Sequence, residues 1–196
     1  MDPMIAALRD PACYPHPVDR VELLETHISW VLLAGAFAYK IKKPVRLPFL
    51  DFSTLAARRR FCEEELRLNR RAAPELYLEV VPIAPGAAGP MVGGAGEPLE
   101  YAVRMRRFAD GALADAMARR GAFGAAQADA IAAALARLHA AAPRAGPGSP
   151  YGSPQRVQAQ ALGNFDQIAA AAPRLARVRA WTAAEWLRLA PVLAAR

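Results

Sequence analysis

The chain has 196 residues, enough for one or two domains, and its hydrophobic fraction of 54% excludes an intrinsically disordered protein. Two cysteines are too few for a disulfide framework or a zinc site built on cysteine pairs. The net charge of +7 suits a phosphate-bearing partner, although the arginines are scattered over several segments in the way typical of solvated helix faces.

Residues 1–25 are predicted to be a short lead-in, because Pro11, Pro15 and Pro17 interrupt it. Its last part, Val18–Glu25, is predicted to form a helical turn or to enter the first strand. The N-terminus has no basic region followed by an apolar one, so no secretion signal is predicted. The longest apolar run, 28–39, is well short of the ~20 residues of a membrane helix. We therefore expect a cytoplasmic protein with no membrane segment.

Residues 26–43 are predicted to form a β-hairpin, because apolar and other residues alternate with the period of a strand on both sides of Ala34-Gly35. Pro44 ends the second strand, since it has no N–H for the ladder. In that strand Phe37, Tyr39 and Ile41 share one face, and Ala38, Lys40 and Lys42 share the other. Two interpretations of Lys40 remain open: a solvated strand lysine, or a lysine in a cleft that binds phosphate oxygens. Lys42 is the second candidate for that role.

A helix is predicted from an N-cap at Asp51 or Ser53 to about Arg71. Its apolar stripes place Glu65 at the edge of the buried arc. This glutamate is predicted either to pair with Lys40 or to remain a surface carboxylate in an acidic cluster. Cys62 lies on the buried stripe, where a thiol behaves as a small hydrophobic side chain rather than as a reactive group.

Leu78–Ile83 and Leu99–Arg106 are predicted strands, rich in branched and alternating residues. Between them, 84–98 is rich in glycine. It predicts a hairpin loop rather than a nucleotide loop, because no Lys-Ser/Thr and no helix follows. After Phe108 the pattern becomes helical, over 110–120, 125–142, about 154–171 and 174–195, with Pro191 expected to kink or end the last helix. The prediction is an α+β protein with lobes at 1–107 and 108–196.

Several segments in combination carry a family resemblance: ETHISWVLLAG (25–35), AYKIKKPV (38–45), FLDFSTL (49–55), RRRFCEEELRLNRRAAPELYL (58–78), EYAVRMRRF (100–108) and ALARLHA (134–140). On these the chain resembles the aminoglycoside phosphotransferase branch of the protein-kinase-like fold. It is most similar to the N-terminal part of bacterial proteins that join such a domain to a C-terminal P-loop ATP-binding domain. The resemblance implies a small antiparallel-sheet N-lobe with one long helix, followed by an incomplete helical C-lobe.

The resemblance also implies roles for individual residues. Ala38 would line the adenine pocket, and Lys40 would hold the α- and β-phosphates of ATP. Glu65 would pair with this lysine and keep it extended. The segment 26–29 takes the place of the phosphate-covering loop but lacks the glycines of kinases. The adenine-contacting hinge would comprise Val103, Arg104, Met105 and Arg106.

The family's catalytic loop, a His-Gly-Asp-x-His motif followed by Asn, and its later metal-binding Asp have no match in the chain. The three histidines, His16, His27 and His139, lie in other contexts. We therefore assign no catalytic residue and no metal ligand, and expect a fragment that is inactive alone. ATP and Mg²⁺ are expected only in the intact protein, with a small-molecule hydroxyl of unknown identity as phosphate acceptor.

Three functions remain open at this point. The first is an ATP-binding, phosphotransferase-like domain, covalently linked to a C-terminal ATP-binding domain in the full-length protein. The second is a non-catalytic pseudokinase that serves as a regulatory scaffold for that linked ATPase. The third and least favoured is a basic nucleic-acid-binding module, because no nucleic-acid-binding motif accompanies the positive charge.

Overall fold

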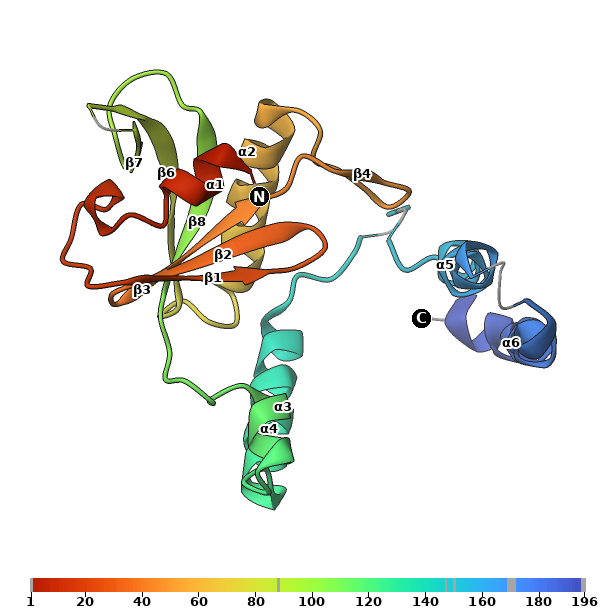
Figure 1. The fold of residues 1–196 in the computed structure, drawn as a ribbon. Helices are drawn as coiled ribbons and strands as arrows, with labels where there is room; N and C mark the ends of the chain where they lie inside the picture. Colours follow the sequence, from red (N-terminus) through yellow and green to blue (C-terminus); the bar gives the residue numbers. More distant parts are fainter. Residues whose placement is uncertain (1, 88, 147, 150, 169–171, 195–196) are drawn as a thin grey trace. The chain divides into compact units, whose positions relative to one another are not determined.

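The computed structural model describes residues 2–87, 89–146, 148–149, 151–168 and 172–194. It confirms the α+β class, with a sheet in the first part of the chain and helices in the second (Figure 1). The chain forms two compact units that divide between Ala140 and Ala141. The change from strands to helices comes earlier, after β8 ends at Arg106.

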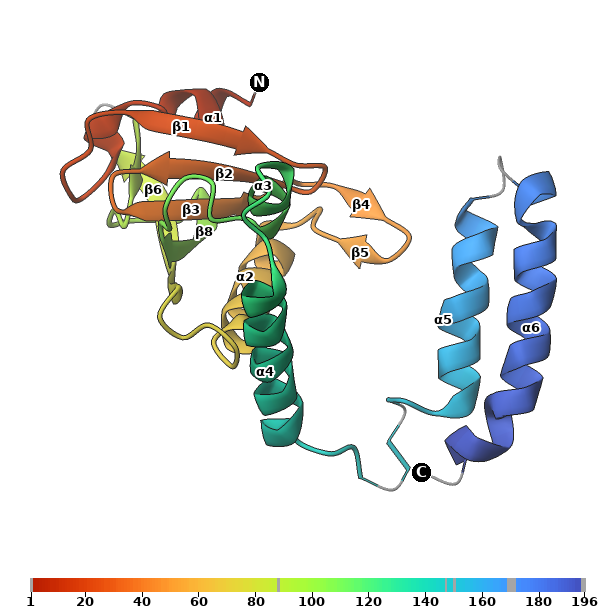
Figure 2. The same ribbon diagram turned by 90° about the horizontal axis from the view of Figure 1, so that it is seen from below.

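One curled antiparallel sheet of six strands organises the first unit, in the order β1-β2-β3-β8-β6-β7 (Figures 1 and 2). The predicted hairpin supplies β2 and β3, and its turn needs Gly35, which has φ 55° and lies against the Pro17 carbonyl. β8 pairs with β3 on one side and β6 on the other. The strands are β1 (Val21–Glu25), β2 (Ser29–Ala34), β3 (Phe37–Lys42), β6 (Tyr77–Gly86), β7 (Gly89–Val92) and β8 (Glu100–Arg106).

The glycine-rich stretch contains more strand than predicted. β6 continues beyond Ile83 to Gly86 and forms a hairpin with β7, with Ile83 opposite Val92. Prolines and glycines have low strand propensity, but β7 lies at the sheet edge, where such residues are tolerated. Within this stretch, residues 93–98 form a loop as predicted.

The N-terminal lead-in belongs to the core. It forms α1 (Pro3–Ala7) and a 3₁₀ turn at Pro11–Cys13. Asp2 caps α1 by accepting hydrogen bonds from two backbone N–H groups, and proline is tolerated in a first helical turn. The main hydrophobic cluster joins this segment to one face of the sheet, and it includes Ile5, Leu8, Cys13, Tyr14, Leu32, Tyr39, Ile41 and Ile83.

The long helix α2 (Leu55–Asn69) packs against β8 and β6 on the other face. Its N-cap is Thr54, whose hydroxyl accepts from the Ala57 N–H at 3.1 Å, and neither predicted cap residue serves. Asp51 instead ends a short hairpin, β4 (Arg46–Leu47) with β5 (Leu50–Asp51), and accepts hydrogen bonds from Ser53. Cys62 is fully buried, as predicted.

All four predicted later helices are present: α3 (Ala114–Arg119), α4 (Ala125–Ala141), α5 (Pro154–Gln167) and α6 (Ala172–Ala194). α6 continues past Pro191, so this proline does not end the helix. α5 and α6 lie side by side (Figure 2), and the Trp186 indole donates to the Pro154 carbonyl at 3.1 Å. None of the helices in the described ranges is long and apolar enough to cross a membrane.

Candidate functional site

The register of the sheet places the predicted site residues on the face that α2 covers. Directly opposed residues of antiparallel strands share a face. Lys40 lies opposite Val31 on β2 and Val103 on β8, and Ala38 lies opposite Met105. Ala38, Lys40, Val103 and Met105 therefore share one face, whereas Tyr39 and Arg104 lie on the face of the main core.

A single glutamate on α2 binds two lysines of β3. Lys40 Nζ donates to Glu65 Oε1 at 2.8 Å, so the predicted pairing is present. Lys42 Nζ donates to Glu65 Oε2 at 2.7 Å and lies over the Phe52 ring. The exposed fractions of the side chains differ: 30% for Lys40, 6% for Lys42 and 13% for Glu65. Lys42 is thus enclosed, and Lys40 reaches solvent.

The charges of this cluster favour an anion. Burial raises the pKa of Glu65, but the hydrogen bonds and charges of Lys40 and Lys42 outweigh that effect, so the pKa lies below its ordinary value. The carboxylate is therefore ionised at neutral pH. Two ammonium groups and one carboxylate leave a net charge of about +1, and its accessible part is the Lys40 ammonium.

The predicted hinge residues divide between the two faces of β8. Val103 and Met105 share the face of Lys40. The Arg104 side chain points to the other face, where it pairs with Glu79 at 2.6 Å, and Arg106 donates to the Glu75 carbonyl. Because β8 has a partner strand on each side, the backbone groups of 103–105 bond within the sheet. The chain leaves the sheet only beyond Arg107, whose N–H donates to Ala36.

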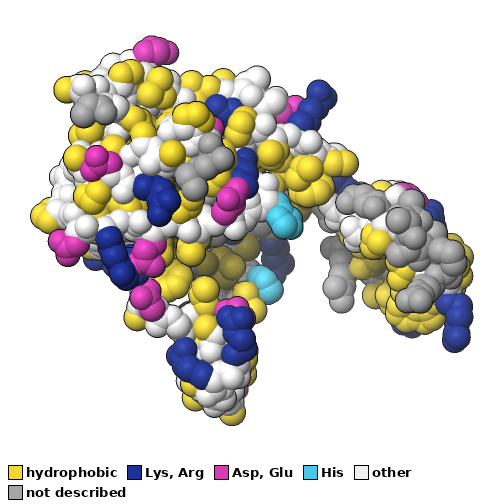
Figure 3. All heavy atoms as spheres, viewed as in Figure 1, with side chains coloured by type: hydrophobic (Ala, Val, Ile, Leu, Met, Phe, Trp, Pro, Cys, Tyr) yellow, Lys and Arg dark blue, Asp and Glu magenta, His cyan; other side chains and the backbone are white. Residues whose placement is uncertain are grey.

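A hollow of about 550 Å³ lies beside Lys40. The turn between β1 and β2 forms one side, and Leu47 and Phe49 of the β4–β5 hairpin form another. Ser29, at the start of β2, also lines it, and its buried hydroxyl has no hydrogen-bond partner. Figure 3 shows hydrophobic side chains gathered on the end of the first unit that carries β4. The segment 26–29 and Lys40 thus border one space.

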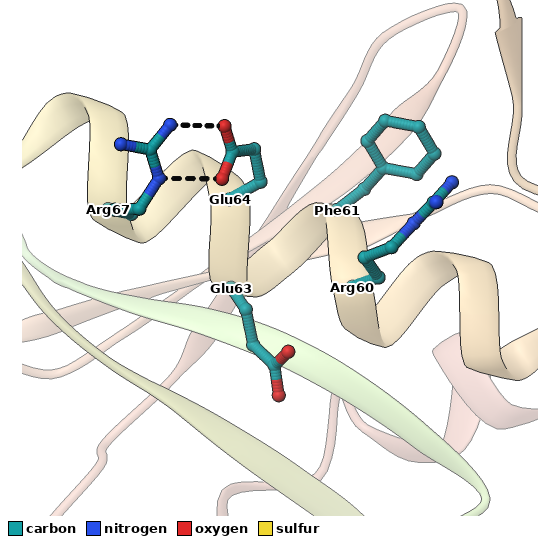
Figure 4. A pocket seen from close by; sticks show the side chains of 5 residues that line it. All are labelled: Arg60, Phe61, Glu63, Glu64 and Arg67. Atoms are coloured by element: carbon teal, nitrogen blue, oxygen red, sulfur yellow. Dashed lines mark hydrogen bonds and ion pairs between the residues drawn. The ribbon is translucent and has the colours of Figure 1, made fainter.

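A second hollow, of about 490 Å³, lies on the outer surface of α2. In Figure 4, Arg67 forms two contacts with Glu64, and Arg60 lies next to Phe61. Glu63 is bound by Arg59 at 2.9 Å. Because these charges pair along the helix itself, this hollow is a solvated helix face, and the space beside Lys40 is the better candidate.

Two features of the site escaped the sequence reasoning. The first is the double role of Glu65, for which the only signal was that Lys40 and Lys42 share a strand face. The second is a buried ion pair behind the site, in which Arg58 Nε donates to Glu100 Oε2 at 2.6 Å. The sequence signal for this ion pair was the position of Arg58, which lies four residues before Cys62 and therefore on the same buried stripe of α2.

Metal-binding groups were not predicted for this chain. Within the described ranges, no three or more His, Cys, Asp or Glu side chains lie close enough together to hold a metal ion. The polar groups at the site are two ammonium groups and one carboxylate, and each oxygen of that carboxylate accepts a hydrogen bond from one of the lysines. This donor set fits phosphate oxygens and does not fit Mg²⁺, which requires oxygen ligands.

Comparison with known proteins finds three curated relatives, each 38% identical over 144 residues. One is an uncharacterized protein of Mycobacterium bovis, and two are uncharacterized proteins of Mycobacterium tuberculosis. The match covers 72% of this chain and 27% of each relative, so the chain spans about a quarter of their length. No family model and no solved structure matches the chain.

Proposed function

We propose that this chain is the nucleotide-binding part of a kinase-like phosphotransferase, with Lys40 as the phosphate contact and Glu65 as the group that holds it. The observation that carries the proposal is the 2.8 Å contact between Lys40 and Glu65, on the strand face that also bears Ala38. A strand lysine held by a helix glutamate is the arrangement that kinases use at the nucleotide phosphates.

Each residue then has a physical task. The Lys40 ammonium offsets the charge of phosphate oxygens from its solvent-exposed position. Glu65 keeps that side chain extended toward α2. The small Ala38 leaves room for a flat base, beside the apolar side chains of Val103 and Met105. Backbone contacts to adenine come from 108–109, where the chain has left the sheet, rather than from 104–106.

The rest of the reaction is proposed for the intact protein alone. There, γ-phosphoryl transfer to a small-molecule hydroxyl needs a base and Mg²⁺ ligands that the residues described here do not offer. The much greater length of the mycobacterial relatives leaves room for those groups and for a linked ATP-binding domain. We expect no turnover from residues 1–196 in a γ-phosphate release assay. Turnover that Lys40→Ala removes would contradict this expectation.

Nucleotide binding is tested by titration calorimetry of the chain with ADP and with ATP. A hydrogen bond to a charged group contributes about 1.5–3 kcal/mol, so Lys40→Met should weaken binding by about 10- to 100-fold. The matched control is Arg119→Met, which removes one positive charge from an exposed position on α3 and should leave the affinity unchanged. Equal affinity of the Lys40 variant and the wild type, or no binding by the wild type, would refute the proposal.

A further inference from the structure

The hollow beside Lys40 combines a cationic end with an apolar end. We propose that it binds a phosphate monoester whose organic group is flat and apolar, such as an aromatic ring. The phosphate would lie at Lys40 and Ser29, and the ring against Phe49 and Leu47. The volume of about 550 Å³ is within the usual range of small-molecule sites.

The anion end rests on two side chains. Lys40 is 30% exposed, and since Glu65 also holds the enclosed Lys42, the carboxylate stays neutralised when Lys40 turns toward a ligand. Ser29 is fully buried, and its hydroxyl has no partner in this structure. A buried hydroxyl without a hydrogen bond is costly, so a ligand oxygen that reaches the floor of the hollow would remove that cost.

The apolar end rests on the β4–β5 hairpin. Phe49 lies in its two-residue turn and is 68% exposed, and Leu47 is 36% exposed. Both side chains line the hollow that Lys40 borders. An exposed aromatic ring beside a cation suits a ligand that stacks a flat group while an anionic group reaches the ammonium.

The remaining charges around the hollow do not oppose such a ligand. Among the residues that the structure describes, Glu25 is the only acidic one that lines it, and the Lys43 ammonium binds its carboxylate. The hydrogen bond and charge of Lys43 lower the pKa of Glu25, and the ammonium offsets the negative charge of the carboxylate. His27, on the same turn, is exposed and adds no negative charge.

This inference deepens the proposed function and rests on it in one respect. Lys40, proposed to bind the α- and β-phosphates of the nucleotide, also borders the hollow, so the hollow would lie next to the phosphoryl group that is transferred, and the phosphorylated product would be a monoester of the kind described. The phosphate acceptor would then carry an aromatic or other flat apolar group next to its hydroxyl. This substrate class follows from Phe49 and Leu47, which nucleotide binding does not use.

The test is titration calorimetry of residues 1–196 with phenyl phosphate and with inorganic phosphate. We expect phenyl phosphate to bind about tenfold more tightly than phosphate, since burying an aromatic group adds at least that factor. Phe49→Ala should abolish the difference and leave the phosphate affinity unchanged. Lys40→Met and Ser29→Ala should weaken both ligands. Tyr151→Ala, which removes an aromatic ring 73% exposed in the other unit, is the control and should change neither affinity.

Two results would overturn the inference: equal affinity of the wild type for the two ligands, or a phenyl phosphate preference that survives Phe49→Ala. A titration with ADP separates this failure from that of the proposed function. Lys40-dependent ADP binding without a phenyl phosphate preference refutes the inference and leaves nucleotide binding intact. A Phe49-dependent preference without ADP binding refutes nucleotide binding and supports the monoester site.

Discussion

The two lysines that share Glu65 should contribute unequally to stability. Lys42→Met removes an enclosed cation, and Lys40→Met removes one that reaches solvent. Methionine retains most of the length of the lysine stem, so packing is largely preserved in both variants. Breaking a buried ion pair costs about 3–5 kcal/mol. We expect about 3 kcal/mol for Lys42→Met, at the lower end because Lys40 still pairs with Glu65, and no more than about 1 kcal/mol for Lys40→Met.

The assay is urea unfolding followed by tryptophan fluorescence. Replacing Trp181 and Trp186 by phenylalanine leaves Trp30 as the single tryptophan, which reports on the sheet alone. The midpoint should fall much further for Lys42→Met than for Lys40→Met. Equal losses, or a larger loss for Lys40→Met, would show that Lys42 does not hold Glu65 independently.

Acid titration of the same variants gives a second readout. The pKa of Glu65 is depressed in the folded state, so its contribution is complete above the unfolded value of about 4.3. That contribution is lost as the pH falls below this value and through the folded pKa. In Lys42→Met, burial still raises the pKa of Glu65, but only Lys40 remains to lower it. The acid-induced loss should therefore begin at a higher pH than in the wild type, and an unchanged acid profile would contradict the assigned cause.

Three further predictions concern the structure around the site. Arg58→Leu should lower the free energy of unfolding in urea by about 3–5 kcal/mol, because it leaves the buried Glu100 carboxylate without its cation. Arg58→Lys should not restore this loss, since lysine lacks the second donor group that reaches the Phe52 carbonyl. Burial raises the pKa of the Cys62 thiol to about 12, so iodoacetamide at pH 8 should label it only in urea, as mass spectrometry would show. Gly35→Ala should cost about 1–3 kcal/mol in unfolding free energy, because φ is positive there and the added Cβ would lie 2.8 Å from a backbone oxygen.

Local periodicity was sufficient to predict the centre of the fold. Alternation of residue types placed Ala38, Lys40 and Lys42 on one strand face, and the stripes of α2 placed Glu65 toward the interior. The shared face did not reveal that both ammonium groups reach one carboxylate, because that depends on how α2 is seated against the sheet. A tertiary distance of this kind has no local signal.

The errors also have physical causes. Pro11 was taken to interrupt the lead-in, but it is the first residue of the 3₁₀ turn Pro11–Cys13, where its missing N–H is not needed. The weak strand propensity of 89–92 was overridden by pairing with β6. The place where β8 leaves the sheet depends on its partner strands, which local composition does not specify, and the predicted hinge at 103–106 remains a prediction. The family resemblance and the nucleotide role remain predictions.

The strand order has a consequence for how the chain is made. β1, β2 and β3 are consecutive and can pair while synthesis continues, but the other edge of β3 must wait for β8, about sixty residues later. Until then the strand that carries Lys40 is an open edge with unpaired backbone groups, which can template pairing with another chain. The two lysines on that strand supply the positive charge that keeps such edges apart. Lys40, which we place at the ligand site, thus also adds charge to the strand whose second edge is the last to be paired.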